Sequence, residues 1–127
     1  MGERVISREA AGQLIYMMSE VVNNGTGARA ALSDRQVAGK TGTTQGARDA
    51  WFLGFSADYV AGVWIGYDDN TPLSGVTGGG LPAEIWRETM TKIHQSMPIR
   101  DLPMMAPDYA ESVSINVRDY MAMVVLG

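Results

Sequence analysis

Three short segments with strand-like composition in the middle of the chain, the first rich in threonine and glycine and the other two apolar, restrict its possible folds more than any other feature. They comprise residues 37–44, 50–55 and 59–67, and only a few polar residues separate each one from the next. Threonine, aromatic and β-branched residues favour strands, and such short connections join antiparallel neighbours. The sequence therefore predicts a three-stranded antiparallel meander. Its second and third strands are apolar on both alternating faces, which predicts that both faces of the sheet are covered.

Two segments with helical spacing flank this predicted sheet. Apolar residues recur every three or four positions over residues 7–23, where Ser7 is a suitable N-cap and Glu9 complements the helix dipole. A second helix is predicted to start at Pro82, because proline is favoured at the first helical position. Its predicted apolar stripe consists of Ile85, Trp86, Met90, Ile93 and Met97. Helices beside an antiparallel sheet place the chain in the α+β class.

The remaining segments are predicted to be connectors and an extension. Glycines over residues 75–80 predict a flexible connector. Three of the five prolines fall between residues 98 and 110, which predicts an extended, linker-like segment. Residues 121–126 suit either a short strand or a short helix. We therefore divide the chain into a domain over residues 1–97 and a proline-rich extension over residues 98–127.

Composition excludes several functional classes. A net charge of -4 gives no basic surface for nucleic acid, and no cysteine is present to form a disulfide or a thiolate metal site. With a single histidine as well, we expect neither a metal nor a cofactor. No apolar run approaches the roughly 20 residues of a membrane span. We expect Met1 to open an internal piece of a longer protein rather than to be a natural start.

Several conspicuous side chains are expected to have structural roles. His94 is predicted to lie on the helix surface, and Asp49 to pair with Arg48 or Arg87. The acidic pair at residues 68–69 is expected in a solvated turn rather than in acid–base chemistry. Aromatic residues at strand and helix spacing usually belong to the core. Those expected there are Trp51, Phe52, Trp64 and Trp86.

The first predicted strand carries the residues on which a functional interpretation depends. Lys40-Thr41-Gly42 resembles the third active-site motif of the penicillin-binding proteins and serine β-lactamases. Alone, Lys40 would be interpreted as a solvated lysine on an edge strand. Further segments, in the same order, resemble the class A bifunctional penicillin-binding proteins, and the resemblance covers about residues 4–97. These segments are VVNNGTG at 21–27, DAWFLGF at 49–55, AGVWIGYD at 61–68 and IWR at 85–87.

The resemblance implies part of a transpeptidase fold of the penicillin-binding-protein and β-lactamase type, with the Lys-Thr-Gly strand along the substrate cleft. Strand alternation places Thr41 and Thr43 on one side, where both hydroxyls can reach the terminal carboxylate of a peptide or penicillin. Lys40 would supply positive charge near the nucleophile, and Gly42 would let the ligand lie along the strand. The Thr43 amide would donate to the oxyanion. Thr44 completes the predicted substrate-binding residues.

The chain departs from this family in one respect that decides its activity. No serine in it is followed three residues later by lysine, so the family's Ser-x-x-Lys nucleophile is missing. Ser114-Ile115-Asn116 has the letters of the family's second motif, but it follows Lys-Thr-Gly instead of preceding it, and we treat it as chance. Thr26, in a Gly-Thr-Gly turn, resembles a family feature near the cleft, and we expect it to shape the loop. The chain alone is predicted to be inactive.

The function that the resemblance implies belongs to a parent protein. That parent would be a peptidoglycan DD-transpeptidase on the periplasmic side of the bacterial inner membrane, with a glycosyltransferase elsewhere. It would bind stem peptides ending in D-Ala-D-Ala and be acylated by β-lactams. A serine β-lactamase fragment is an alternative, although the tryptophan-rich strands and the Gly-Thr-Gly element argue against it. A non-enzymatic sheet module that binds a peptide by strand addition is another.

The truncation implies an exposed sheet edge. If upstream strands normally pair with the strand over residues 59–67, this chain leaves an apolar edge with unpaired backbone groups. We therefore expect self-association, or capture of that edge by residues 121–126.

Overall fold

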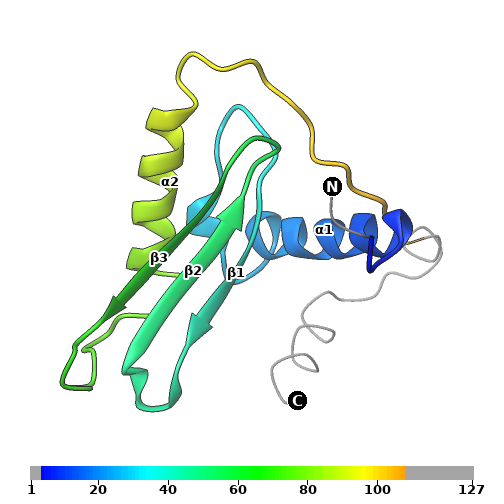
Figure 1. The fold of residues 1–127 in the computed structure, drawn as a ribbon. Coiled ribbons are helices and arrows are strands. Elements are labelled where there is room, and N and C mark those ends of the chain that lie inside the picture. The colour runs from blue at the N-terminus through cyan, green and yellow to red at the C-terminus, as the bar shows by residue number, and fades with distance from the viewer. Residues whose placement is uncertain (1–3, 108–127) are drawn as a thin grey trace.

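A computed structural model of the chain describes residues 4–107. Its strands form one antiparallel sheet in the order β1-β2-β3, and both α-helices pack against the same face (Figure 1). The predicted α+β fold with a three-stranded meander is confirmed. In chain order the elements are α1 (Arg8–Asn23), η1 (Ala28–Ala30), β1 (Ala38–Thr43), η2 (Gln45–Ala47), β2 (Asp49–Phe55), β3 (Val60–Gly66) and α2 (Leu81–Ile93).

The ends of both helices follow from local chemistry. The Ser7 hydroxyl accepts a hydrogen bond from the Ala10 amide at 3.0 Å, which satisfies one of the free amides at the start of α1. Helix α2 begins at Leu81, one residue earlier than predicted, so Pro82 occupies the second helical position. Proline is tolerated there because amides in the first turn have no intrahelical partner.

The core lies between the sheet and the two helices. Phe52, in the middle strand, is fully buried and meets Trp86 of α2 edge-to-face, with ring centroids 5.3 Å apart. The Trp86 indole nitrogen donates to the Ala61 carbonyl of β3 at 2.9 Å, so its polar atom is also satisfied. The buried cluster consists of Val22, Ala30, Val37, Phe52, Ala83, Trp86 and Met90.

The opposite face of the sheet is open in the part of the chain that the structure describes. Trp51 and Leu53 of β2 are 47% and 53% exposed, and Trp64 of β3 is 44% exposed. The two tryptophans are register partners whose ring centroids lie 6.1 Å apart. The predictions that both faces are covered and that Trp51 and Trp64 belong to the core are therefore wrong. Apolar residues alternate onto both faces, but residues 4–107 supply a helical layer for only one of them.

The buried face of α2 differs from the predicted apolar stripe. Ile85 and Ile93 are 39% and 43% exposed, whereas Ala83 and His94 are buried. The prediction of His94 at the helix surface is wrong because both ring nitrogens have partners within the protein. One is 2.7 Å from the Met90 carbonyl, and the other is 2.9 Å from the Ser56 hydroxyl.

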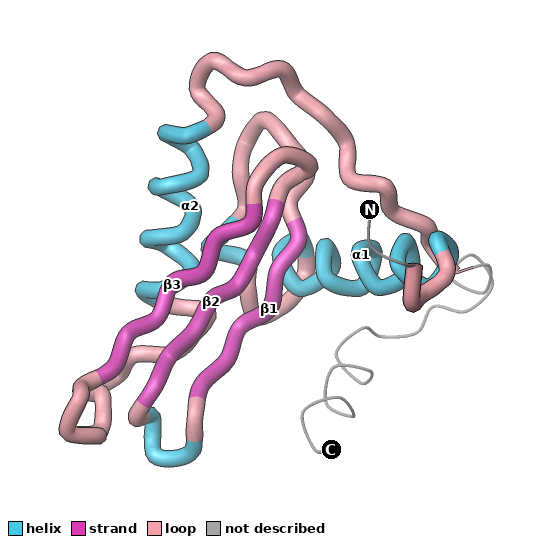
Figure 2. Tube along the Cα trace, viewed as in Figure 1, coloured by secondary structure: helices cyan, strands magenta, loops and turns pink. Residues whose placement is uncertain are grey.

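Residues 98–107 follow α2 without forming a helix or strand, and Figure 2 shows this segment arching from α2 to α1. They are extended, as predicted, but they pack along the domain. The Leu102 amide donates to the Gln36 side chain at 2.9 Å, and the Met105 amide donates to the Gly12 carbonyl at 3.0 Å. The predicted strand or helix at residues 121–126, and its capture of an edge, lie outside the described residues. The division at residue 97 stays a prediction.

Within residues 4–107, neither α1 nor α2 combines the length and the apolar character that crossing a membrane requires.

Candidate functional site

Strand β1 forms one margin of the three-stranded sheet and carries the Lys-Thr-Gly motif in its centre. Its register pairs Thr41 with Phe52, so Thr41 and Thr43 share the face on which the helices pack, while Lys40 and Gly42 share the other. Thr41 is half-buried at this margin, and Thr43 is exposed. The structure therefore places the two threonine side chains together, as strand alternation requires.

The backbone of β1 presents amides to its free side. The Thr44 amide donates to the Asp49 carbonyl at 3.0 Å, so these two residues form a hydrogen-bonded pair. In an antiparallel ladder such pairs alternate with pairs whose amides point outward. The Thr43 amide consequently points away from β2, toward the edge that no strand of residues 4–107 covers.

Groups from elsewhere in the chain contact both threonine hydroxyls on this face. Thr41 Oγ1 lies 2.9 Å from Thr26 Oγ1, which belongs to the turn after α1. Thr43 Oγ1 accepts a hydrogen bond of 3.1 Å from the Gly78 amide, just before α2. The third hydroxyl, that of Thr44, is used locally, because it bonds both the amide and the carboxylate of Asp49.

Lys40 is half-buried and folds back along its own strand. Its Nζ donates to the Thr41 carbonyl at 3.0 Å and lies 3.5 Å from Thr41 Oγ1. None of the salt bridges among the described residues involves Lys40. The ammonium group therefore keeps its positive charge uncompensated beside the Thr41 hydroxyl.

The segment before α2 packs tightly against β1, which corrects the prediction of a flexible connector over residues 75–80. Gly78 is buried, and a Cβ at this position would overlap the carbonyl oxygens of Trp51 and Gly42. A Cβ at Gly79 would overlap the Thr26 carbonyl oxygen. Sequence reasoning missed this contact. The run of three consecutive glycines was its only signal, since glycine allows close backbone approach as well as flexibility.

Asp49 has a structural role at the end of the sheet, but its predicted partners are wrong. Its carboxylate accepts hydrogen bonds from Trp64 Nε1 at 2.9 Å and from Thr44. Arg48 donates instead to the Asn70 carbonyl, and Arg87 pairs with Glu84. The Asp49 carboxylate is hydrogen-bonded by the Trp64 indole and the Thr44 hydroxyl. Arg48 therefore contacts the turn at Asn70, and Arg87 contacts Glu84 within α2.

Among residues 4–107, two carboxyl groups outside β1 have a pKa below the ordinary value. The side-chain hydrogen bond from Arg35, helped by its charge, holds the pKa of Asp34 below its ordinary value of 3.8. Hydrogen bonding from Thr71 likewise holds the pKa of Asp69 below 3.8. The Asp69 contact forms within an exposed turn, as predicted for residues 68–69.

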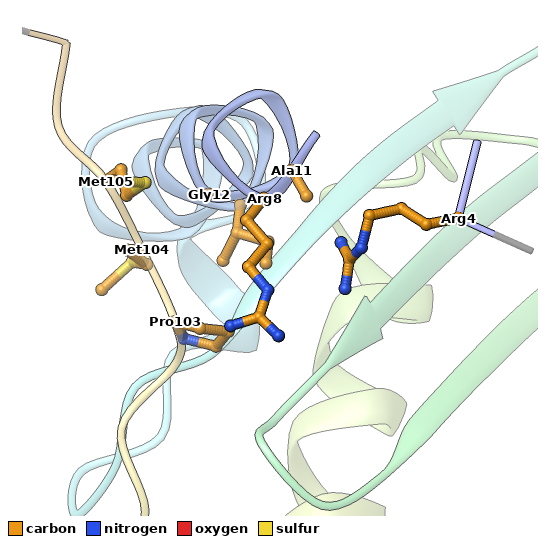
Figure 3. Close-up of a pocket in the computed structure, with 8 residues that line it drawn as sticks. Arg4, Arg8, Ala11, Gly12, Pro103, Met104 and Met105 are labelled. Carbon is orange, nitrogen blue, oxygen red and sulfur yellow. The ribbon is translucent and has the colours of Figure 1, made fainter. Parts of the chain in front are cut away.

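Two hollows of the described surface lie away from the motif. One lies between α1 and the segment that carries Pro103 and Met105, and Figure 3 shows Arg4 and Arg8 reaching into it. The other lies beside Arg35 and His94. Across residues 4–107, no group of three or more histidine, aspartate and glutamate side chains is placed to hold a metal ion.

Comparison with known proteins identifies the family. A family model described as the penicillin binding protein transpeptidase domain matches residues 1–91. The chain belongs to this family. The resemblance to penicillin-binding proteins that the motifs indicated is thereby confirmed, and with it the class of fold to which the edge strand contributes.

The related proteins are much longer than this chain. Penicillin-binding protein 1A of Aquifex aeolicus is 38% identical over 118 residues, which are 92% of this chain and 16% of that protein. Penicillin-binding protein 1A of Pseudomonas aeruginosa is 39% identical over 104 residues, 80% of this chain and 12% of that protein. The crystal structure of penicillin-binding protein 1A from Haemophilus influenzae matches with a TM-score of 0.68 at 30% identity. That match covers 84% of this chain and 17% of that one.

Proposed function

We propose that this chain supplies the Lys-Thr-Gly wall of a peptidoglycan DD-transpeptidase whose nucleophilic serine lies in polypeptide outside these 127 residues. The observation that carries this proposal is the arrangement on β1. Two threonine side chains share one face. The Lys40 ammonium group, which forms no salt bridge within residues 4–107, lies beside the first, and the amide of the second points to a free edge. Family membership supports the reaction class, a serine acyl transfer.

The wall is suited to holding a carboxylate. A hydroxyl donates one hydrogen bond and accepts two, so Thr41 and Thr43 can each donate one to an anionic oxygen. Lys40 adds a positive charge 3.5 Å from Thr41 Oγ1, and charge-assisted hydrogen bonds are shorter and stronger than neutral ones. The substrate that fits is the carboxyl end of a stem peptide ending in D-Ala-D-Ala, or a β-lactam that mimics it.

The exposed backbone of β1 suits the developing negative charge of an acyl-transfer intermediate. The Thr43 amide points away from β2 at the free edge of the sheet, where it can donate to an oxyanion. Removing one such donor costs about a hundred- to a thousandfold in rate in a serine hydrolase of another fold. Gly42, beside it, leaves the strand free of a side chain on the opposite face. Lys40 and the Thr43 amide thus have catalytic roles, and Thr41, Gly42 and Thr43 have substrate-binding roles, whereas the Thr44 hydroxyl is occupied by Asp49.

The isolated chain should be catalytically inactive. Its serines lack the family's Ser-x-x-Lys spacing, and removal of the nucleophile costs about a millionfold in a serine hydrolase of another fold. Catalysis therefore requires the longer protein, which we place on the periplasmic side of the inner membrane by its similarity to penicillin-binding protein 1A.

The proposal is tested in the protein expressed from the complete reading frame that contains this chain. Wild-type protein should be covalently labelled by fluorescent penicillin. Lys40→Met should lower the labelling rate about a hundredfold, because it removes the charge and the proton-relay group but keeps the length of the side chain. Thr43→Val should lower it as well, because it replaces the hydroxyl with a methyl group of similar size.

Thr91→Val is the matched control for Thr43→Val, since Thr91 lies on the exposed side of α2 and bonds only the Arg87 carbonyl of its own helix. It should leave labelling unchanged. Wild-type labelling that neither Lys40→Met nor Thr43→Val reduces would overturn the assigned roles. Absence of labelling in the wild-type protein would favour a strand-addition module over an enzyme.

A further inference from the structure

Each threonine hydroxyl on the helix-covered face of β1 is held by a group from a different part of the chain. Thr26, in the turn after α1, bonds Thr41, and the Gly78 amide, just before α2, bonds Thr43. We propose that Thr26 and Gly78 are positioning residues that orient these hydroxyls toward the carboxylate of the ligand. This inference rests on the proposed function, because it assigns how the proposed carboxylate site is preorganised.

The contact at Thr43 directs the hydroxyl proton. A hydroxyl has one proton and two lone pairs, and the Gly78 amide occupies a lone pair of Thr43 at 3.1 Å. The proton therefore remains available to an anionic acceptor. Because Thr43 is exposed, that acceptor can approach from solvent. A backbone amide cannot accept a hydrogen bond in return, so the Gly78 contact admits only this direction of donation.

The contact at Thr41 completes a short chain of polar groups. Lys40 Nζ lies 3.5 Å from Thr41 Oγ1, which in turn lies 2.9 Å from Thr26 Oγ1. When Thr26 donates to Thr41, the Thr41 proton is free for the ligand, as it is at Thr43. Thr26 itself is exposed at the end of this chain. The contacts from Lys40 and Thr26 would hold the Thr41 rotamer in place before a ligand arrives.

Glycine is required where the segment before α2 meets the strand. A Cβ at Gly78 would overlap backbone oxygens of both β1 and β2, and a Cβ at Gly79 would overlap the Thr26 carbonyl. Neither clash can be relieved by turning a side chain, because the opposing atoms belong to the backbone. At Gly80, by contrast, the nearest atom to a Cβ is the Thr77 carbonyl oxygen at 3.3 Å, which requires only a small adjustment.

Preorganisation has a measurable benefit for binding. Donors that are already oriented lose little rotamer freedom when the ligand binds, and this lowers the cost of association. They also need no reorganisation during the reaction. The two contacts should therefore affect ligands that carry a carboxylate and leave ligands without one largely unaffected.

The hydrogen bond at Thr43 can be tested in this 127-residue chain by amide hydrogen exchange. In Thr43→Val the Gly78 amide loses its acceptor and should exchange about fivefold faster, the factor expected for one ordinary hydrogen bond. Thr43→Ser should restore the protection. The Gly80 amide, which donates to the Thr77 carbonyl at 2.9 Å, serves as the internal control and should not change. Equal Gly78 exchange in all three proteins would overturn the proposal, whatever the function of the chain.

The effect of these contacts on ligand binding is tested in the protein from the complete reading frame. The probes are a fluorescent penicillin, which carries a free carboxylate, and its methyl ester, which does not. Thr26→Val removes the neutral hydrogen bond to Thr41, so it should slow acylation by the free acid about fivefold without slowing acylation by the ester. Thr26→Ser should restore the rate, and Gly80→Ala should match wild type. Equal slowing of both probes, or no slowing, would overturn the positioning role. A wild-type protein that reacts with neither probe would overturn the proposed function, and the exchange result would still decide the geometry.

Discussion

Trp86 and Trp64 are the same residue type in opposite environments. Trp86 of α2 is fully buried against Phe52 of β2, whereas Trp64 is 44% exposed on the open face of the sheet. Replacing a buried tryptophan by alanine removes packing and leaves a cavity, so Trp86→Ala should lower the free energy of unfolding by about 3–5 kcal/mol. Trp64→Ala should cost clearly less. Urea denaturation of both variants measures the difference, and equal losses would contradict the assigned core.

Asp34 gives the stability of the protein a dependence on pH. The Arg35 hydrogen bond holds the pKa of Asp34 below 3.8 in the folded state, so the carboxylate stabilises the fold at pH values above 3.8. This stabilisation is lost as the pH falls through the lowered pKa of the folded state. Wild type should therefore exceed Asp34→Asn in stability by a constant amount near neutral pH, and the difference should disappear in acid. Urea titrations across the acid range measure it, and a constant difference at every pH would count against the Asp34–Arg35 pair.

At the level of elements, residues 98–107 pack along the domain and are expected to stabilise it. Leu102 is only 6% exposed, and Met105 lies against Gly12 of α1, where an added Cβ would approach the Met105 side chain to 2.7 Å. Leu102→Ala should cost about 2–5 kcal/mol, because the removed atoms are buried. Ile99→Ala is the control, since Ile99 is 62% exposed. Thermal or chemical denaturation compares them, and a protein ending at residue 97 that is as stable as the full chain would refute this role.

The sequence was sufficient to predict the strands and helices because their signals are local. Alternation and short connections predicted the meander, and Ser7 marked the start of α1. Burial could not be predicted in the same way, because it depends on which layer covers which face. Trp51 and His94 show this, since one is apolar but exposed and the other is polar but buried.

In the candidate site, too, the residues with local sequence signals could be predicted, and the contacts that depend on the fold could not. Lys40, Thr41 and Thr43 were named from the motif, and strand alternation placed the two threonines together. The family resemblance placed Thr26 near the cleft, but its hydrogen bond to Thr41 and that of Gly78 to Thr43 could not be predicted, because these residues are distant in sequence from β1 and contact it only through the fold. A glycine run indicates flexibility or close packing, and only the neighbouring backbone decides between them.

At the level of the whole molecule, one face of the sheet is uncovered within residues 4–107, and no further strand of this range pairs with either edge strand, β1 or β3. β3 is a terminal strand of the sheet, and the open face carries the exposed side chains of Trp51, Leu53 and Trp64. Unpaired strand edges and large apolar patches promote association. We expect the 127-residue chain to self-associate, with an apparent mass in sedimentation that rises with concentration. A monodisperse monomer at all concentrations would contradict this expectation.

We propose that this chain binds the carboxylate of the ligand and contributes no nucleophile. Fluorescent penicillin added to the isolated 127-residue chain, followed by denaturing electrophoresis, is the decisive measurement. No covalently labelled band is expected from this chain, and a strong band is expected from the protein of the complete reading frame, whose labelled peptide should contain a serine outside residues 1–127. A labelled serine within these residues would show that the nucleophile lies in this chain instead.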